Sequence, residues 1–182
     1  MKAIITTLLT LLFVSSTLSA EQPKQSAATF DLKTMNGKTI HIKGTENGLD
    51  IAEYKGKVIF LEFWGTHCPP CLASIPHYVD MINKYKGKLA MLGVEVQNTP
   101  KSRLQAFAQA KKINYDVVTY QDAGYFVDYI AQRAGWKGSI PFLLILDPKG
   151  NVITMQVGML PQNVLEKVVN DYIDGNKTAA EK

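Results

Sequence analysis

The two cysteines of the chain are the residues best suited to chemistry, and they lie three positions apart as Cys68-Pro69-Pro70-Cys71. The segment follows an apolar run and opens a helical pattern, so Cys68 is expected at a helix N-terminus, where unpaired N–H groups favour thiolate over thiol. Cys71 comes one helical turn later, close enough to close a disulfide and more shielded. In that arrangement Cys68 attacks a substrate disulfide and Cys71 resolves the mixed disulfide. We therefore predict a catalytic Cys68–Cys71 dithiol that cycles through a redox-active disulfide.

Cysteine pairs at this spacing also serve in haem and metal sites. Covalent haem attachment requires His directly after the second cysteine, and this chain has Leu72 there. A structural zinc site needs two further ligands, for which the sequence offers His41, His67 and His77. No histidine follows His77, which argues against a copper chaperone with a downstream histidine. A redox dithiol without metal or other cofactor is therefore favoured, and a copper- or zinc-binding metallochaperone is the alternative.

The two prolines between the cysteines carry no backbone N–H. The Cys68 thiolate therefore loses hydrogen-bond donors that other residues would offer at the start of the helix. A thiolate that is stabilised less makes the reduced protein the better electron donor. The hypothesis that follows is that the protein acts as a reductase, and equilibration against glutathione tests it.

Strand and helix patterns alternate around the cysteine pair and predict one α/β domain in which helices cover a central sheet. A hairpin is expected first, with strands at 30–32 and 39–42 around Asn36-Gly37, followed by a loop over 44–57 with one helical turn at 51–54. The predicted strands are then 58–63, 89–96, 115–119, 142–147 and 151–157, and the predicted helices are 68–85, 101–112, 126–134 and 161–173. Val164, Leu165 and Val168 are expected to form the apolar face of the last helix.

Composition and the N-terminal segment restrict the setting in which the dithiol works. The chain has 182 residues, 46% hydrophobic and 20% charged, and a net charge of +4, which suits a globular domain and is too small for a nucleic-acid binder. Residues 1–20 combine Lys2, an apolar stretch and small polar residues, as in a secretory signal peptide, with an uncleaved membrane anchor as the alternative. We expect a mobile lead-in over 21–28, the folded domain over 29–174 and a polar tail over 175–182. The mature protein is then expected in the periplasm or another extracytoplasmic compartment, where disulfides form.

Two longer segments resemble a known family. Glu62–Cys71 reads EFWGTHCPPC, and Gly138–Leu143 reads GSIPFL, followed by the turn Asp147–Gly150, DPKG. Both segments are similar to those of the TlpA/ResA-like extracytoplasmic thiol–disulfide oxidoreductases of the thioredoxin superfamily, and the resemblance runs over about residues 30–173. It implies a thioredoxin-like α/β fold, with a central mixed β-sheet flanked by helices and, here, an N-terminal β-hairpin extension.

The resemblance also implies roles for residues around the dithiol. Pro141 would be a cis-proline that faces the cysteines, and the backbone of Ile140 would pair with an extended substrate strand. Glu62 would be a buried acid with a raised pKa that accepts the Cys71 proton. The other interpretations are an ordinary trans proline at position 141 and, for Glu62, an edge position that reaches solvent or pairs with a lysine.

Trp64 and His67 are expected to contact substrate. By the resemblance, Trp64 lines the wall of the active site, with core packing as the alternative. The protonated form of His67, next to the nucleophile, would help to hold a thiolate, with an exposed residue that contacts substrate or water as the alternative. His67 stands where the family's cytochrome c maturation members have tryptophan, and Ser74 stands where they often have glutamate. These departures concern the choice of partner rather than the dithiol chemistry.

The function predicted from the sequence is that of a protein-disulfide reductase outside the cytoplasm. By the resemblance, its substrates are protein disulfides, with apocytochrome c among the candidates, and its electrons come from a membrane-embedded dithiol donor. A monomer without a nucleic-acid partner is expected. A disulfide oxidase or isomerase of the same fold is the alternative within the enzyme class.

Overall fold

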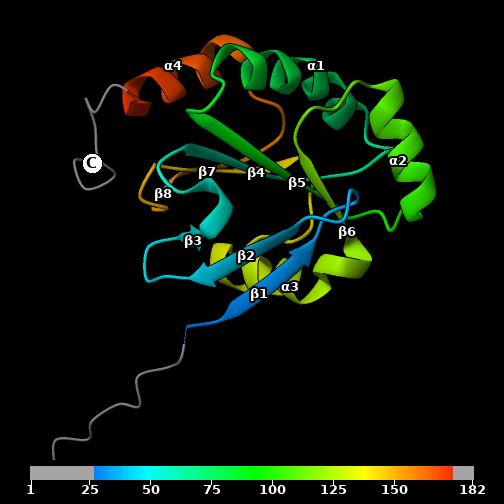
Figure 1. Cartoon of the computed structure of the whole chain (residues 1–182), viewed down its shortest axis with the longest axis horizontal. Coiled ribbons are helices and arrows are strands. Elements are labelled where there is room, and N and C mark those ends of the chain that lie inside the picture. The colour runs from blue at the N-terminus through cyan, green and yellow to red at the C-terminus, as the bar shows by residue number, and fades with distance from the viewer. Residues whose placement is uncertain (1–26, 174–182) are drawn as a thin grey trace, which may run out of the picture.

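Residues 27–173 are described in the computed structural model of the chain (Figure 1). The predicted signal peptide over 1–20, most of the lead-in over 21–28 and the tail over 175–182 lie outside the described residues. Among residues 27–173, none of the helices combines the length and the apolar character that a membrane crossing requires.

A five-stranded mixed sheet forms the centre of the domain. Its strands are β4 (Val58–Trp64), β5 (Leu89–Glu95), β6 (Asp116–Thr119), β7 (Phe142–Leu146) and β8 (Val152–Val157), in the spatial order β6-β5-β4-β7-β8. The strands β4, β5 and β6 run parallel to one another, whereas β7 is antiparallel to both β4 and β8. Strand β4 therefore lies in the middle of the sheet, and all of its residues are buried. The predicted mixed sheet is confirmed.

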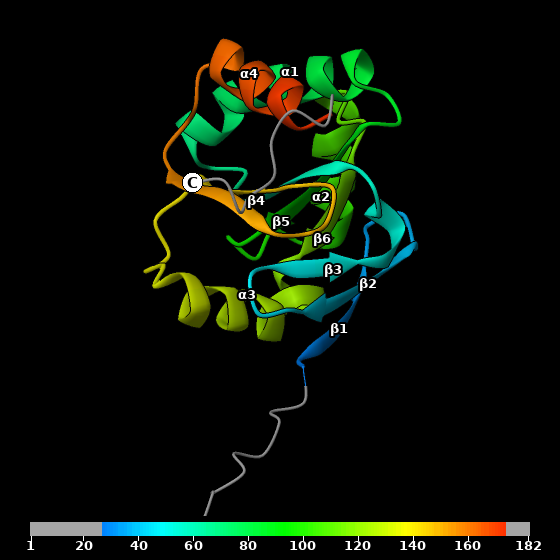
Figure 2. The same ribbon diagram turned by 90° about the vertical axis from the view of Figure 1, so that its left-hand side faces the viewer.

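Helices cover both faces of this sheet (Figures 1 and 2). The helices are α1 (Pro69–Lys84), α2 (Lys101–Ala110), α3 (Tyr120–Ala134) and α4 (Gln162–Ile173). Both views place α1 and α4 on one side of the sheet and α3 on the other. Since side chains alternate along a strand, Phe60, Glu62 and Trp64 of β4 point toward the core beneath α1, and Leu61 and Phe63 point toward the core beside α3. Glu62 thus shares a face with the helix that carries the cysteines.

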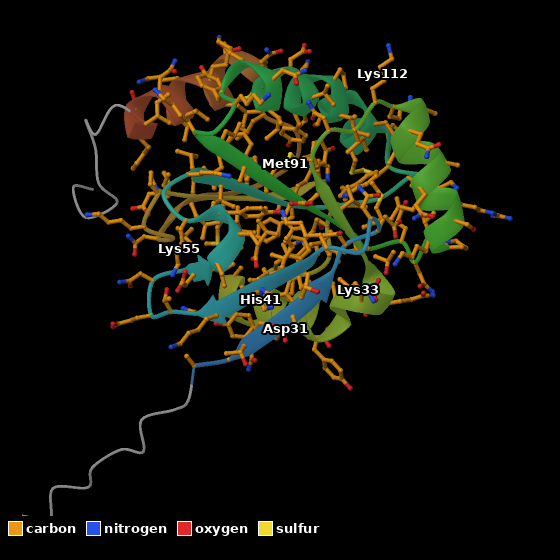
Figure 3. All side chains as sticks on the ribbon, in the orientation of Figure 1. Asp31, Lys33, His41, Lys55, Met91 and Lys112 are labelled. Atoms are coloured by element: carbon orange, nitrogen blue, oxygen red, sulfur yellow. A yellow bond between two sulfur atoms is a disulfide. The ribbon has the colours of Figure 1, made fainter. Side chains whose placement is uncertain are left out.

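A smaller antiparallel sheet precedes the central one, in the order β1-β2-β3. The hairpin of β1 (Thr29–Lys33) and β2 (Thr39–Gly44) confirms the predicted extension, and a short 3₁₀ turn, η1 (Ala52–Tyr54), follows β3 (Leu49–Ile51). In Figure 3 the labelled Asp31, Lys33 and His41 lie on the hairpin, where they are exposed, whereas Met91 lies among the side chains that fill the interior. The hairpin therefore has a polar outer face and an apolar face that packs on the domain.

Strand β3 was not predicted, because its conformation depends on contact with a distant turn. The N–H of Leu49 donates to the carbonyl of Gly150 at 2.9 Å, and the N–H of Val152 donates to Asn47 at 3.0 Å. A Cβ at Gly48 would overlap the carbonyl oxygen of Gly150, so the two chain segments can approach this closely only with glycine at position 48. This contact ties the N-terminal sheet to β8.

Two helix predictions needed correction. Helix α3 begins at Tyr120 rather than at residue 126, because Thr119 caps it: the Thr119 hydroxyl accepts a hydrogen bond from the Asp122 N–H at 3.2 Å. In α4 the buried residues are Leu165, Val169 and Tyr172, whereas Val164 is exposed. The prediction of Val164 on the apolar face was therefore wrong. The buried face of α4 is centred one position further along the chain.

Candidate active site

The two cysteines form a disulfide at the N-terminus of α1, just beyond the end of the central strand β4. Their sulfur atoms are 2.03 Å apart and their Cα atoms 5.2 Å apart. Cys68 is the N-cap of the helix and keeps 6% of its surface exposed, whereas Cys71 is 0% exposed. An incoming thiol or disulfide therefore reaches Cys68 first, and Cys71 is shielded, as the sequence predicts.

The start of α1 offers few hydrogen-bond donors to Cys68. Pro69 and Pro70 occupy the first two helical positions and have no N–H group. The first available donor is the N–H of Cys71, which lies 3.3 Å from the Cys68 sulfur. An N-cap side chain normally accepts from the second or third helical N–H, so here only the third remains. This is the local arrangement that the proline pair was expected to produce.

Glu62 is buried in the middle of the sheet, on the face that α1 covers. It lies opposite Gly93 of β5 and Leu143 of β7 and is 1% exposed. The hydroxyl of Tyr78 donates a hydrogen bond to Glu62 Oε1 at 3.2 Å. Burial raises the pKa of Glu62 to about 8, and the hydrogen bond from Tyr78 opposes that rise. The interpretation of Glu62 as an edge residue was wrong, and its carboxyl can exchange a proton near neutrality.

The surroundings of Glu62 include two further buried polar groups. The indole N–H of Trp64 and the hydroxyl of Tyr115 have no hydrogen-bond partner among the described residues. Burial raises the pKa of Tyr115, and the charge of Glu62 adds to the rise. Gly93 keeps the space between these groups open, because a Cβ there would lie 2.9 Å from Trp64 Nε1. The carboxyl thus faces a small polar region within an otherwise apolar core.

Tyr78 is a site residue that the sequence analysis did not identify. It lies seven residues after Cys71, two helical turns along α1, so both side chains lie on the face of the helix that packs against the sheet. Ser74, between them, is also buried, and its hydroxyl donates to the carbonyl of Pro70 at 3.1 Å. The spacing from Cys71 was the signal that could have identified Tyr78.

The loop before β7 lies at the same end of β4 as the cysteines. The Ile140–Pro141 bond is cis, which confirms that prediction. Phe142 pairs with Phe63, so Pro141 lies next to the end of β4 from which the chain leads to Cys68. The carbonyl of Pro141 accepts from the N–H of Gly158 at 2.8 Å, whereas within residues 27–173 no hydrogen bond engages the backbone of Ile140.

His67 and Trp64 have different surroundings. His67 is exposed; its backbone N–H donates to Gln97 Oε1 at 2.8 Å, and its ring Nδ1 lies 3.1 Å from the Thr66 hydroxyl. Trp64 is 1% exposed and its ring packs against Phe107, with 5.8 Å between the ring centres. Of the two interpretations of Trp64, core packing therefore describes the protein, and Trp64 belongs to the same buried cluster as the two cysteines.

The part of the chain that the structure describes contains no group of three or more His, Cys, Asp or Glu side chains that could hold a metal ion. Tyr78 and Tyr115 belong to the same buried cluster as the two cysteines, Glu62 is hydrogen-bonded to Tyr78, and His67 directly precedes Cys68. They can donate, accept or store protons. The arrangement is therefore suited to thiol chemistry coupled to proton transfer.

A disulfide at the start of the helix after a central strand, with a cis-proline loop at the same end of that strand, defines a thioredoxin-like protein with a redox-capable cysteine pair. The chain belongs to the AhpC/TSA family, whose sequence profile matches residues 23–155.

Individual relatives agree with this assignment. The chain is 26% identical to the thiol-disulfide oxidoreductase ResA of Halalkalibacterium halodurans over 148 residues, which are 79% of this chain and 73% of that protein. It is 29% identical to the thioredoxin-like protein YneN of Bacillus subtilis, over 80% of this chain and 78% of that protein. Among solved structures, StoA of Bacillus subtilis matches with a TM-score of 0.58 at 21% identity, over 77% of this chain and 95% of that one. A thiol:disulfide interchange protein of Chlorobium tepidum matches with a TM-score of 0.63 at 24% identity, over 81% and 95%.

Proposed function

We propose that this thiol–disulfide oxidoreductase acts outside the cytoplasm as a reductase of protein disulfides. The observation that carries the proposal is the asymmetry of the pair: Cys68, at the helix N-terminus, keeps 6% of its surface exposed, whereas Cys71 is fully buried on the face of α1 that also carries Tyr78, the hydrogen-bond donor to Glu62. Relatives named thiol-disulfide oxidoreductases support the reaction class. The signal-like segment over 1–20 supports the location.

The proposed cycle transfers two electrons from the reduced cysteine pair to the substrate. The Cys68 thiolate attacks one sulfur of the substrate disulfide, and the other substrate sulfur leaves as a thiolate that takes a proton from solvent. The Cys71 thiol then gives its proton to the Glu62 carboxylate, directly or through a water, and attacks Cys68. The second substrate thiol is released, and the protein is left with the disulfide that the structure contains.

The backbone of Ile140 is the proposed docking point for the substrate. Its N–H and C=O are not engaged by other described residues, and it adjoins the cis-proline at the end of β4. An extended substrate segment can pair with these groups as an added strand does at a sheet edge. The paired segment would then present its disulfide to Cys68.

The direction of electron flow is argued from the donors at the helix start. The Cys68 thiolate receives one N–H, from Cys71, because Pro69 and Pro70 provide none. A hydrogen bond to a charged group contributes about 1.5–3 kcal/mol, so the absence of one leaves the reduced form, with its Cys68 thiolate, less stable and the pair more reducing. A membrane-embedded dithiol donor would return the pair to its reduced form. Apocytochrome c is the candidate substrate that the resemblance suggests.

The reduction potential of the Cys68–Cys71 couple, measured by equilibration against glutathione, tests the direction. A potential below roughly −200 mV is expected, and a value near roughly −120 mV, typical of a dedicated oxidase, would overturn the reductase assignment. Pro70→Ala adds the second helical N–H, which points toward an N-cap side chain, so it is expected to raise the potential by about 30–60 mV. Pro69→Ala is the matched control, because the first helical N–H does not reach the cap.

Trapping of the mixed disulfide tests the substrate. A Cys71→Ser variant retains the nucleophile and lacks the resolving thiol, so substrates remain attached to Cys68 and can be identified by mass spectrometry. Cys68→Ser is the control and should trap nothing above background, since Cys71 is fully buried. Recovery of apocytochrome c with Cys71→Ser and not with Cys68→Ser would support apocytochrome c as a substrate. Its consistent absence among many trapped proteins would exclude apocytochrome c as a substrate.

A further inference from the structure

Glu95 is a second buried carboxylate near the active site, and it takes no part in the exchange described above. It ends β5 in register with Trp64 of β4 and is fully buried. Its oxygens accept hydrogen bonds from the backbone N–H groups of Gln97 at 3.1 Å and Thr99 at 2.9 Å, and from the Thr99 hydroxyl at 2.7 Å. A buried carboxylate with three donors is a fixed acceptor that orders the loop after β5.

A continuous chain of hydrogen bonds connects this carboxylate to the residue that precedes the nucleophile. The Thr99 hydroxyl lies 2.8 Å from the Thr66 hydroxyl, and the Thr66 hydroxyl lies 3.1 Å from Nδ1 of His67. The backbone N–H of His67 also donates to the side chain of Gln97, in the same loop. Side-chain hydroxyls and one carboxylate therefore span the distance from the core to the surface beside Cys68.

The number of hydrogens that each group carries fixes which group donates in each of these hydrogen bonds. A carboxylate only accepts, so the single hydroxyl hydrogen of Thr99 is used on Glu95. Thr99 must then accept from Thr66, which uses the single hydroxyl hydrogen of Thr66. Thr66 can therefore only accept from His67, and Nδ1 of His67 must carry a hydrogen. In the neutral ring, the other nitrogen, Nε2, is then left with a free lone pair.

The ring that is oriented in this way borders a groove beside the active site. The groove is lined by Thr66, His67, residues 97–100, Arg103 and Phe107. Arg103 is the other charged side chain along this groove in the part of the chain that the structure describes, and it cannot accept a proton. His67 is exposed there and is bonded to Cys68 through the main chain.

We propose that Glu95, Thr99 and Thr66 are positioning residues that hold His67 in the Nδ1–H form, so that its Nε2 accepts the proton of the Cys68 thiol before attack. In this step the Sγ–H bond of Cys68 breaks, an Nε2–H bond forms and no electrons are exchanged. The resulting imidazolium donates through Nδ1 into the chain that ends at the Glu95 carboxylate. The arrangement follows the logic of a carboxylate that orients a catalytic imidazole, here through two hydroxyls. The proton-acceptor role rests on the proposed dithiol function, whereas the tautomer does not.

Nitrogen-15 NMR of the histidine rings in the oxidised full-length protein tests the tautomer, at a pH where His67 is neutral. His67→Asn assigns the signals of His67. The expected result is a protonated Nδ1 and an unprotonated Nε2 in the wild type and in Thr66→Ser, which keeps the hydroxyl. In Thr99→Val the Thr66 hydrogen is free to donate to Nδ1, so the hydrogen of His67 should move to Nε2. A wild-type ring protonated at Nε2, or a tautomer unchanged by Thr99→Val, would overturn the proposal.

The rate at which iodoacetamide alkylates Cys68 tests the proton-acceptor role, and it does so without reference to the direction of electron flow. The measurement uses the reduced protein with Cys71→Ser as background, near neutral pH. Thr99→Val is expected to slow alkylation by roughly two- to tenfold, the effect of one hydrogen bond, while Thr66→Ser keeps the wild-type rate. A tautomer that shifts without any change in alkylation would overturn the role of Nε2. A reduction potential typical of an oxidase would refute the reductase assignment and leave both results in place.

Discussion

Replacement of Glu62 by glutamine removes one proton-binding group from the core and almost none of its volume. The carboxyl is 1% exposed, has one hydrogen-bond donor, Tyr78, and has a pKa raised to about 8 by burial. The unfolded chain has an ordinary glutamate there, with the usual value of 4.5. Between these two values the folded protein binds a proton that the unfolded chain has released. Glutamine resembles the protonated form at every pH, so Glu62→Gln isolates the contribution of this proton.

The sign and the size of the effect follow from this difference. Because the native state binds more protons in this window, the free energy of unfolding falls as the pH rises from about 4.5 and continues to fall until about 8. At 1.36 kcal/mol per pKa unit, the whole window corresponds to about 5 kcal/mol, of which about 3–4 kcal/mol falls between about pH 5 and pH 8. We expect Glu62→Gln to match the wild type near pH 5 and to exceed its stability by about this amount near pH 8.

Urea unfolding of the oxidised protein, followed by circular dichroism at several pH values, measures this difference directly, since the disulfide does not titrate. Glu166→Gln is the matched control. The hydrogen bond from Lys84 lowers the pKa of Glu166, so its contribution to stability is lost as the pH falls, below the window in question. The control should therefore keep the wild-type slope. Parallel stability curves for the wild type and Glu62→Gln would show that the carboxyl is ionised throughout, and would refute both the raised pKa and its use as a proton acceptor.

Two further predictions concern the surroundings of Glu62. Tyr78→Phe removes the hydrogen bond that lowers the pKa of Glu62, so the pH range over which stability falls should extend to higher pH in the same titration; a range unchanged or shifted to lower pH would contradict that role. Gly93→Ala would place a methyl group 2.9 Å from Trp64 Nε1 in a buried strand, and should lower the free energy of unfolding by roughly 1–3 kcal/mol. Its control is Gly124→Ala, in α3, where no atom lies within 4 Å of the added carbon and a gain of about 0.5–1 kcal/mol is expected in the same urea assay. If both alanine variants behave alike, the space at Gly93 is not restricted.

The sequence predicted the strands and helices that contain their own periodic signals, and it missed what depends on distant contacts. The apolar run of β4 and the Cys-Pro-Pro-Cys segment were sufficient to place the dithiol at a helix N-terminus. The three residues of β3 lack a periodic pattern, and they are extended because Leu49 bonds to Gly150, about a hundred residues away along the chain. Helix α3 begins six residues before its predicted start. The cap formed by Thr119 and Asp122 was a local sequence signal for that start, but the prediction used only the apolar pattern, which does not show it.

In the active site, too, the features that the sequence did not settle are those that depend on how distant segments pack together. The burial of Glu62 could not be decided from its own strand, because an apolar run with one acid fits an edge strand as well as a central one. The strand order decides it, since β5 and β7 flank β4 on both sides. Likewise, Thr66 and Thr99 are separated by many residues, and they meet because the parallel pairing of β4 with β5 brings the loops that follow both strands to one edge of the sheet.

The two buried glutamates differ in the number of hydrogen-bond donors, and this difference separates their roles. Glu95 accepts three hydrogen bonds, two of them from backbone N–H groups that cannot rotate away, so its oxygens are held in place and can orient other groups. Glu62 accepts one hydrogen bond, from a tyrosine, and is removed from solvent by burial, so its charged form is costly and a proton is readily taken up. Buried acids on neighbouring strands can therefore provide a hydrogen-bond acceptor fixed in position and a group that exchanges a proton. The active site needs both if His67 is to activate Cys68 and Glu62 is to activate Cys71, because the two thiols must lose their protons at different steps of the cycle.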